Sequence, residues 1–373
     1  MKVNFKIIVC ASLSALFLAS FALAASYEAY GLVTDADKFT SLSFSALYGM
    51  PSSNLIYAED DGNSSDETSD EADTPSDEND LSGGDVTSGG DDNAKCNAND
   101  NANENTADGA EYAIISSDLS TGAEYGLEAS NQTSYEINLL DCLKSEPTTP
   151  TLDEIKSEFS LDEYVPVVLI IHTHGTEAYS DRSTYSESED FRSTNIDENV
   201  VAVGSVMSDY FNSVGITTIH CTEMFDLESY VDAYTKSAAA VSEYTAIYPS
   251  ISYVFDVHRD CIINDELECV SAVTTVNGDS VAQFMCVVGT DEYAGLHTGW
   301  RDNLAFACRL QYKLWSISPS LTRRLSIRSA SYNQLYASGS LLFEIGTCGN
   351  TLDEAKACAL YVAEAVAEII LGG

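Results

Sequence analysis

Two histidines and a carboxylate follow directly after the most apolar segment in the middle of the chain. Residues 165–171 form a nearly continuous apolar run, and His172, His174 and Glu177 come next. Such a run is typical of a strand buried on both faces, and the carboxyl ends of such strands border the crevices where α/β proteins place their sites. His172 and His174 are two residues apart, so in extended backbone their side chains point to the same side. We therefore expect a functional site at this strand end.

Two further apolar strands carry groups of the same kind. Residues 253–257 run into His258, Arg259 and Asp260, and the apolar segment 341–346 contains Glu344. A histidine at a strand end most often only makes hydrogen bonds. Three histidines together with a carboxylate embedded in a strand instead favour one zinc site, because catalytic zinc takes three imidazole or carboxylate ligands and keeps one position for water.

Glu344 is the least expected residue for its position. A carboxylate within an apolar strand is costly to bury without a partner, so it needs either a counter-ion or a chemical role. We expect it to be the general base that takes a proton from zinc-bound water. The alternative is an ion pair with Arg259 or Arg328. Arg259 itself is expected to orient a ligand or to contact a substrate carboxylate, with a surface ion pair as the alternative.

The elements that must position these residues alternate between strand and helix. Amphipathic helices are predicted over residues 199–214, 230–244 and 300–315, and Thr351 with Glu354 forms a capping box that opens a final helix ending at residue 371. Asn277-Gly278 between two β-rich segments predicts a hairpin. The pattern indicates an α/β domain over residues 131–373, with three layers: a largely parallel sheet and helices on both of its faces.

The N-terminal third of the chain has a different composition. Residues 1–25 have two lysines and an apolar run, which predicts either a cleaved export signal or an uncleaved membrane anchor. Residues 59–108 contain seventeen acidic residues and one lysine, so residues 26–130 are expected to be a mostly disordered, extended linker. The orientation rule for lysines places the rest of the chain outside the cytoplasm, anchored at the membrane or secreted if the leader is removed.

The composition also excludes some classes of partner. The net charge of −42 excludes nucleic acid, whose phosphates would repel such a surface, and argues against electrostatic docking on anionic lipid. The ten cysteines include no C-x-x-C pair and therefore offer no metal signature. Cys286, Cys308 and Cys358 lie in apolar patterns and are expected to be small buried core residues.

These strand-end motifs together resemble a known family. The segments 171–179 (IHTHGTEAY), 256–260 (DVHRD), 332–334 (YNQ) and 342–351 (LFEIGTCGNT) look like the stage II sporulation protein P family, with residues 199–204 and 287–289 in the expected order between them. The resemblance covers roughly residues 131–371. It implies a peptidoglycan hydrolase that acts during forespore engulfment. Such enzymes are N-acetylmuramoyl-L-alanine amidases that also cut cross-links, and they work with other engulfment proteins, one of them a lytic transglycosylase.

The resemblance also implies roles for individual residues. The implied fold is similar to that of the zinc-dependent type-3 amidases, which is a phosphorylase/hydrolase-like fold. By that similarity His174 and His258 bind zinc and Glu344 activates water. The third ligand stays open: Glu198, just before a predicted helix, is the first choice, and Glu177 and His172 compete with it. We expect Arg259, Asn303 and Asn333 near the substrate.

Two other functions are compatible with the same motifs. One is a catalytically inactive module that binds or scaffolds the cell wall. The other is a general secreted autolysin that acts outside sporulation. The intact set of His174, His258 and Glu344 argues against the inactive module.

Overall fold

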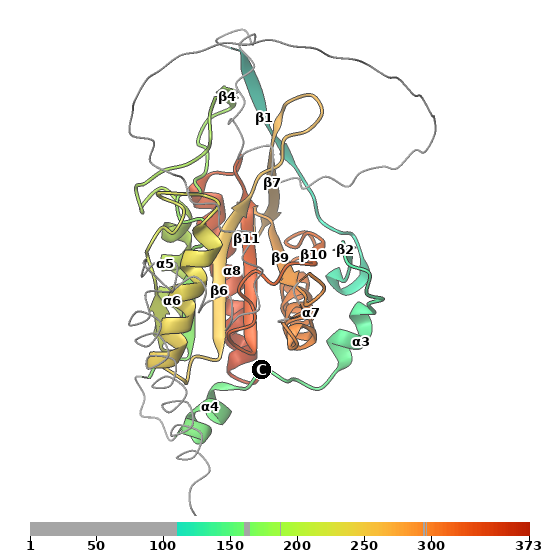
Figure 1. Ribbon diagram of the computed structural model, residues 1–373. Helices are drawn as coiled ribbons and strands as arrows, with labels where there is room; N and C mark the ends of the chain where they lie inside the picture. The colour runs from blue at the N-terminus through green and yellow to red at the C-terminus, as the bar shows by residue number, and fades with distance from the viewer. Residues whose placement is uncertain (1–109, 160–164, 187, 294, 296) are drawn as a thin grey trace, which may run out of the picture. The chain divides into compact units, whose positions relative to one another are not determined.

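The structure is a computed structural model that describes residues 110–373 except 160–164, 187, 294 and 296 (Figure 1). The predicted leader and most of the predicted linker lie outside the described residues. Within the described part of the chain, every helix is too short or too polar to span a bilayer.

A seven-stranded sheet forms the centre of the domain. Five of its six neighbouring pairs are parallel, and only β9 and β11 pair antiparallel, which confirms the predicted, largely parallel sheet. In spatial order its strands are β2 (Ala129–Asn131), β10 (Leu325–Arg328), β9 (Phe284–Gly289), β11 (Gly339–Thr347), β6 (Tyr253–Asp260), β3 (Val168–Ile171) and β5 (Thr218–His220).

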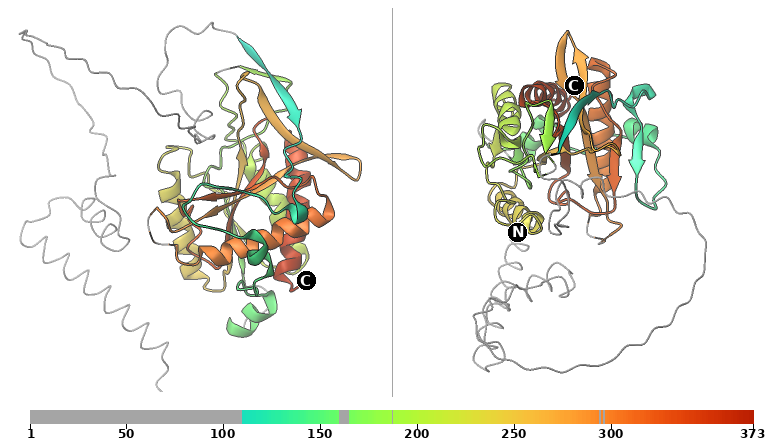
Figure 2. Two further views of the ribbon diagram at one scale, coloured as in Figure 1. Left: turned by 90° about the vertical axis from the view of Figure 1, so that its right-hand side faces the viewer. Right: turned by 90° about the horizontal axis from the view of Figure 1, so that it is seen from above.

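Helices cover both faces of this sheet, as predicted for three layers (Figure 2). Successive residues of β3 serve opposite faces, because side chains alternate along a strand. Leu169 and Ile171 pack in the smaller core with residues of α6, whereas Val168 and Ile170 belong to the larger core beneath the other long helices. The four long helices are α5 (Val200–Ser213), α6 (Ala233–Ile247), α7 (Trp300–Ile317) and α8 (Leu352–Ile370).

The helix ends follow the predicted signals. The Thr351 side chain accepts a hydrogen bond from the Glu354 amide, and the Glu354 carboxylate accepts one from the Thr351 amide, so the predicted capping box is present. Asn199 caps α5 by accepting from the Val201 amide. In the part of the chain from residue 110 to β3 that the structure describes, the short helices are η3 (Glu124–Gly126), α3 (Leu139–Lys144) and α4 (Leu152–Phe159).

A second, four-stranded sheet lies beyond the carboxyl ends of β6 and β11 (Figure 1). Its strands in order are β4 (Thr184–Ser186), β1 (Glu111–Ser117), β7 (Cys269–Val276) and β8 (Asp279–Ala282). Asn277 and Gly278 join β7 to β8 with φ of 53° and 96°, which confirms the predicted hairpin turn.

The folded domain begins earlier than the predicted boundary at residue 131. Strand β1 pairs with β7, and β2 pairs with β10, so the chain from residue 111 onward belongs to the sheets. The β-forming segment 111–117 is short and follows directly on the acidic stretch, and its pairing partner lies about 150 residues further along. Pairing at such a distance leaves no local signal in the sequence.

The cysteines of the core behave as small apolar residues. Cys286, Cys308 and Cys358 are fully buried thiols, as expected from their apolar surroundings. A separate small core holds two more free thiols, Cys269 and Cys348, whose sulfurs lie 3.4 Å apart.

Candidate metal centre

The segment that follows β3 is held against β6 by one aspartate. Asp256 of β6 accepts hydrogen bonds from the Thr173 amide at 2.8 Å and from the Thr173 hydroxyl at 2.5 Å. The next turn requires glycine, because a Cβ on Gly175 would lie 2.6 Å from Cγ of Met224. These contacts fix the backbone on both sides of His174 and turn its ring toward β6.

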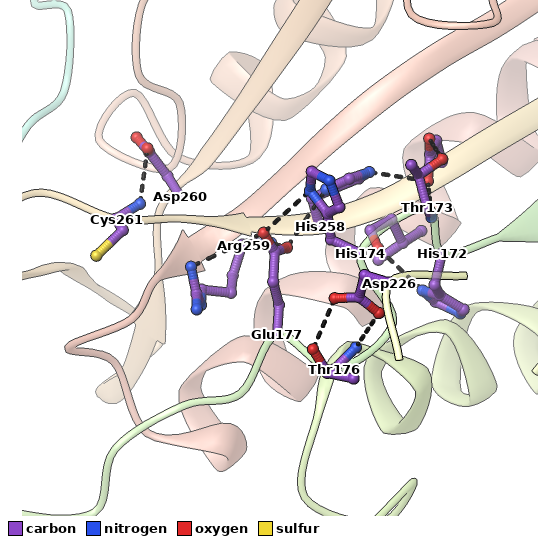
Figure 3. A network of polar contacts seen from close by, with 12 residues as sticks. His172, Thr173, His174, Thr176, Glu177, Asp226, His258, Arg259, Asp260 and Cys261 are labelled. Atoms are coloured by element: carbon purple, nitrogen blue, oxygen red, sulfur yellow. Dashed lines mark hydrogen bonds and ion pairs between the residues drawn. The ribbon is translucent and has the colours of Figure 1, made fainter. Parts of the chain in front are cut away.

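Three buried groups converge beyond these strand ends. The ligand atoms of His174, Glu177 and His258 all lie within 4.8 Å of one another. Glu177 lies between the two rings, with Oε1 3.5 Å from His174 Nδ1 and Oε2 3.3 Å from His258 Nδ1 (Figure 3). The ring centroids are 5.1 Å apart at an interplanar angle of 81°. Two imidazoles and a carboxylate in this arrangement form a donor set that zinc prefers.

Unpartnered atoms at the centre fit a bound cation. Nε2 of His174 and Oε2 of the neighbouring Glu344 are buried and have no hydrogen-bond partner. Nε2 of His258 differs, because Asp256 Oδ1 lies 2.9 Å from it as an ionic neighbour. A buried polar atom without a partner is destabilising. A metal ion would remove that penalty.

The charges of the centre are strongly coupled. Burial alone would raise the pKa of Glu177, but Arg259, His258 and hydrogen bonds from both imidazoles hold it well below its usual value. Burial alone would lower the pKa of His258, and the carboxylates of Asp256 and Glu177 raise it well above its usual value instead. In the absence of a metal ion, these carboxylates therefore favour the protonated form of the His258 imidazole.

Glu344 lies beside this cluster, as expected. Its strand β11 runs parallel to β6, and Glu344 pairs in register with His258, so both side chains project from the same face of the sheet. Glu344 is 5% exposed, and its Oε2 has no hydrogen-bond partner. Burial, together with the neighbouring Asp260 carboxylate, raises its pKa to about 8. A carboxyl group with a pKa in this range is suited to take up and release protons near neutral pH.

The two arginines considered as partners of Glu344 are engaged elsewhere. Arg259 is buried, and its guanidinium donates to the carbonyl oxygens of Ala178 and Phe191 at 3.0 Å each. Its Nη1 lies 3.9 Å from Glu177 Oε1. Arg328 bonds to Ser326 and Gln132. Arg259 therefore holds the loop that carries Glu177 and supports that carboxylate with its charge, which is the orienting role that the sequence suggested. Its contact with substrate stays a prediction.

The third member of the cluster with His174 and His258 is Glu177, where the sequence favoured Glu198. Glu198 is exposed and accepts a hydrogen bond from Ser193, outside the cluster. His172 also points elsewhere: its Nδ1 contacts the Val257 carbonyl oxygen at 2.9 Å, and its Nε2 contacts His220 at 2.9 Å. The backbone changes direction at Gly175. As a result, His174 and Glu177 face His258, and His172 does not.

The two asparagines expected near the substrate have structural roles. Asn303 is buried in α7, where its amide donates to the Gln334 carbonyl oxygen and contacts His297, and its oxygen accepts from the Ser340 amide. Asn333 donates to the Tyr234 carbonyl oxygen at 3.0 Å and to the Ser237 hydroxyl at 2.9 Å. Both join loops to helices through these hydrogen bonds, and their contact with substrate stays a prediction.

Two residues of the centre were not anticipated. Asp256 lies two residues before His258 on the same strand, so period-2 alternation could have placed it on the same face. Tyr230 stacks on the His174 ring, with centroids 4.1 Å apart. It comes from the connection after β5, and no local pattern marks it.

Comparison with known proteins bears on this geometry. The family model for stage II sporulation protein P matches residues 52–367. The chain belongs to this family. The stage II sporulation protein P of Bacillus subtilis (strain 168) is 26% identical over 217 residues, which are 54% of this chain and 51% of the relative. The chain thus spans about half the length of that curated relative.

Some solved structures show a distant likeness. The N-acetylmuramoyl-L-alanine amidase AmiC2 of Nostoc punctiforme matches with a TM-score of 0.33 and 14% identity, covering 57% of this chain and 97% of that one. The apo form of the N-acetylmuramyl-L-alanine amidase Ami1 from Mycobacterium abscessus matches with a TM-score of 0.33 and 16% identity, covering 56% and 97%. At this level the likeness adds nothing to the strand order and layers described above.

Proposed function

We propose that the chain is a zinc-dependent peptidoglycan hydrolase that cleaves the amide between N-acetylmuramic acid and L-alanine. The observation that carries the proposal is the buried cluster of His174, Glu177 and His258, with Glu344 in register beside His258 on the neighbouring strand. Membership of the stage II sporulation protein P family and the wall amidases among the distant structural matches are consistent with the same substrate.

In amide hydrolysis, some residues of the site would bind the metal ion and Glu344 would transfer the proton. A bound zinc ion would polarise the scissile carbonyl and lower the pKa of water. His174, Glu177 and His258 would hold the ion, and Arg259 would keep the Glu177 carboxylate ionised through its charge. Glu344 would take a proton from the attacking water and pass it to the leaving amine of alanine. Its buried position excludes bulk water from that transfer.

We also propose a cellular setting for this reaction, based on membership of the family. The substrate would be the wall between the engulfing membrane and the forespore, and peptide cross-links would be a second target. The partners would be other engulfment proteins, including a lytic transglycosylase. The chain would act outside the cytoplasm, anchored by its N-terminus or secreted if the leader is cleaved.

Digestion of purified sacculi tests the proposed chemistry. The purified chain, loaded with one equivalent of zinc, should clear a sacculus suspension, and a chelator should stop the clearing until zinc is restored. Mass spectrometry of the soluble products should find free stem peptides with an N-terminal L-alanine. Binding of the wild-type chain to sacculi without any released peptide would contradict the proposal and would favour a wall-binding scaffold. Activity restricted to sporulating cells would separate it from a general autolysin.

A further inference from the structure

One of the two imidazoles of the centre is packed between aromatic rings. The His174 ring stacks on Tyr230 with centroids 4.1 Å apart and an interplanar angle of 20°. Tyr234 of α6 meets the same ring edge-on, at 5.4 Å and 81°. His258 meets it from a third side at 5.1 Å. Among the described residues, the polar contact at Nδ1 of His174 is the 3.5 Å approach to Glu177, so aromatic packing makes up most of the surroundings of this ring.

An arginine lies over the same tyrosine. The guanidinium carbon of Arg192 is 5.0 Å from the Tyr230 ring centroid, within the range of a cation–π contact. Its Nη1 donates to Asp226 Oδ2 and to Thr176 Oγ1, both at 2.6 Å. Asp226 in turn accepts from the Thr176 amide at 3.1 Å and from its hydroxyl at 2.6 Å (Figure 3). The cation is thus anchored between two segments of the site and cannot rotate away from the ring.

This arrangement connects directly to the residues of the centre. Thr176 lies between His174 and Glu177 in the chain, so the contacts of Asp226 fix the turn that presents both ligands. Asp226 has no exposed side-chain surface and Arg192 is 19% exposed, so their ion pair is shielded from water. A shielded pair of this kind holds its geometry, and loss of either partner would leave a buried charge uncompensated.

We infer that Tyr230, held under Arg192, is a positioning residue that sets the ring orientation of His174 for metal binding. The inference rests on the proposed metal centre. It assigns Tyr230 no contact with substrate or with the reacting atoms. A ligand imidazole is commonly oriented by a hydrogen bond from its second nitrogen. Here a flat stacked ring supplies that orientation, so the shape of the side chain at position 230 should matter more than its hydroxyl group.

The test compares Tyr230→Phe with Tyr230→Leu in the full chain, using zinc competition against a chromophoric chelator. Tyr230→Phe keeps the flat ring and should bind zinc within about 2-fold of wild type. Tyr230→Leu should bind about 10–100-fold more weakly, the loss expected when an orienting partner of a ligand is removed. The visible absorption spectrum of the cobalt-substituted protein should change in Tyr230→Leu and stay unchanged in Tyr230→Phe. A role in folding alone would not move that spectrum.

Tyr312→Leu is the matched control, because it removes a stacked tyrosine of α7 that packs on Trp315. It should leave zinc affinity and the cobalt spectrum unchanged. If Tyr230→Leu does not fold, Arg192→Lys keeps a charge for Asp226 and removes the flat cation, and it should show a smaller change in the same direction. A wild type that binds metal, together with a Tyr230→Leu variant of equal affinity and spectrum, would overturn the inference. A wild type that binds no metal would overturn the proposed centre itself.

Discussion

His258 and Glu344 are register partners on the adjacent parallel strands β6 and β11. The pairing places an imidazole of the metal cluster and an unpaired buried carboxyl side by side on one face of the sheet. Neighbouring strands lie about 4.8 Å apart, so the two groups have a separation set by the backbone and not by flexible side chains. A ligand and a proton acceptor held in this way need no movement of the loops to come together.

Replacement of Glu344 by glutamine should abolish proton transfer while leaving the metal cluster intact. Loss of a general base costs on the order of 10²–10⁴-fold in rate, so the release of stem peptides should fall by that factor while zinc content stays at one equivalent. Glu364→Gln, on an exposed position of α8, is the control and should behave as wild type. Loss of zinc from Glu344→Gln would mean that Glu344 is a ligand and not the base.

A pair of glutamate variants distinguishes the two candidates for the third ligand. Glu177→Gln should weaken zinc binding by at least the 10–100-fold that follows loss of an outer-shell partner, because it removes a ligand carboxylate and leaves the charges of Arg259 and His258 unbalanced. Glu198→Gln changes an exposed carboxylate and should bind zinc as wild type does. Isothermal titration of both metal-free variants measures the difference, and the opposite ranking would restore Glu198 as the ligand.

Because Arg259 holds the loop that carries Glu177, its replacement should lower the free energy of unfolding. Arg259→Lys cannot donate to the Ala178 and Phe191 carbonyl oxygens together, so about 1–3 kcal/mol of the free energy of unfolding should be lost. Denaturant unfolding at a fixed zinc concentration measures it. If Arg259→Lys has wild-type stability and a raised KM, then Arg259 contacts the substrate and does not hold the loop.

The raised pKa of Glu344 predicts how the stability of the metal-free protein depends on pH. Between its usual value of 4.5 and about 8 the folded state holds more protons at Glu344 than the unfolded state does. The contribution of Glu344 to the free energy of unfolding should therefore fall as pH rises through this window, whereas the lowered pKa values of His172, His220 and His297 act with the opposite sign below 6.5. The raised pKa of His258 acts with the same sign as that of Glu344 above its usual value of 6.5. The lowered pKa of Glu177 acts below 4.5, outside the window.

Thermal unfolding in the presence of a chelator checks this dependence. Between about pH 7 and about pH 8.5, the melting temperature of the wild-type chain should decrease relative to that of Glu344→Gln, because glutamine does not titrate. Equal slopes for the two proteins would show that Glu344 does not carry the effect.

The sequence predicted the strands that bear His174, His258 and Glu344 because each is a continuous apolar run ending in, or containing, a polar group. It could not decide between Glu177 and Glu198. That choice depends on the turn at Gly175, whose tight contact is with Met224, about 50 residues away in the chain. The same limit applies to Tyr230 and Asp226, which reach the site through the connection after β5.

The hydrogen bonds by which Asn303, Asn333 and Arg259 join distant segments could not be predicted for a related reason. A polar residue near a motif can face the site or join two loops. Only its hydrogen-bond partners in the folded structure show which of these it does. All three donate to backbone carbonyl oxygens of distant segments. The early start of the domain at β1 escaped prediction because strand pairing over such a distance has no local pattern.

The most direct test of the metal centre is an anomalous difference map at the zinc absorption edge from crystals of the zinc-loaded protein. We predict one strong peak, about 2.0–2.2 Å from a ring nitrogen of His174, a ring nitrogen of His258 and a carboxylate oxygen of Glu177, with the Glu344 carboxyl nearby but not bonded to it. A peak between His172 and His220, or one coordinated by Glu198 in place of Glu177, would contradict the account.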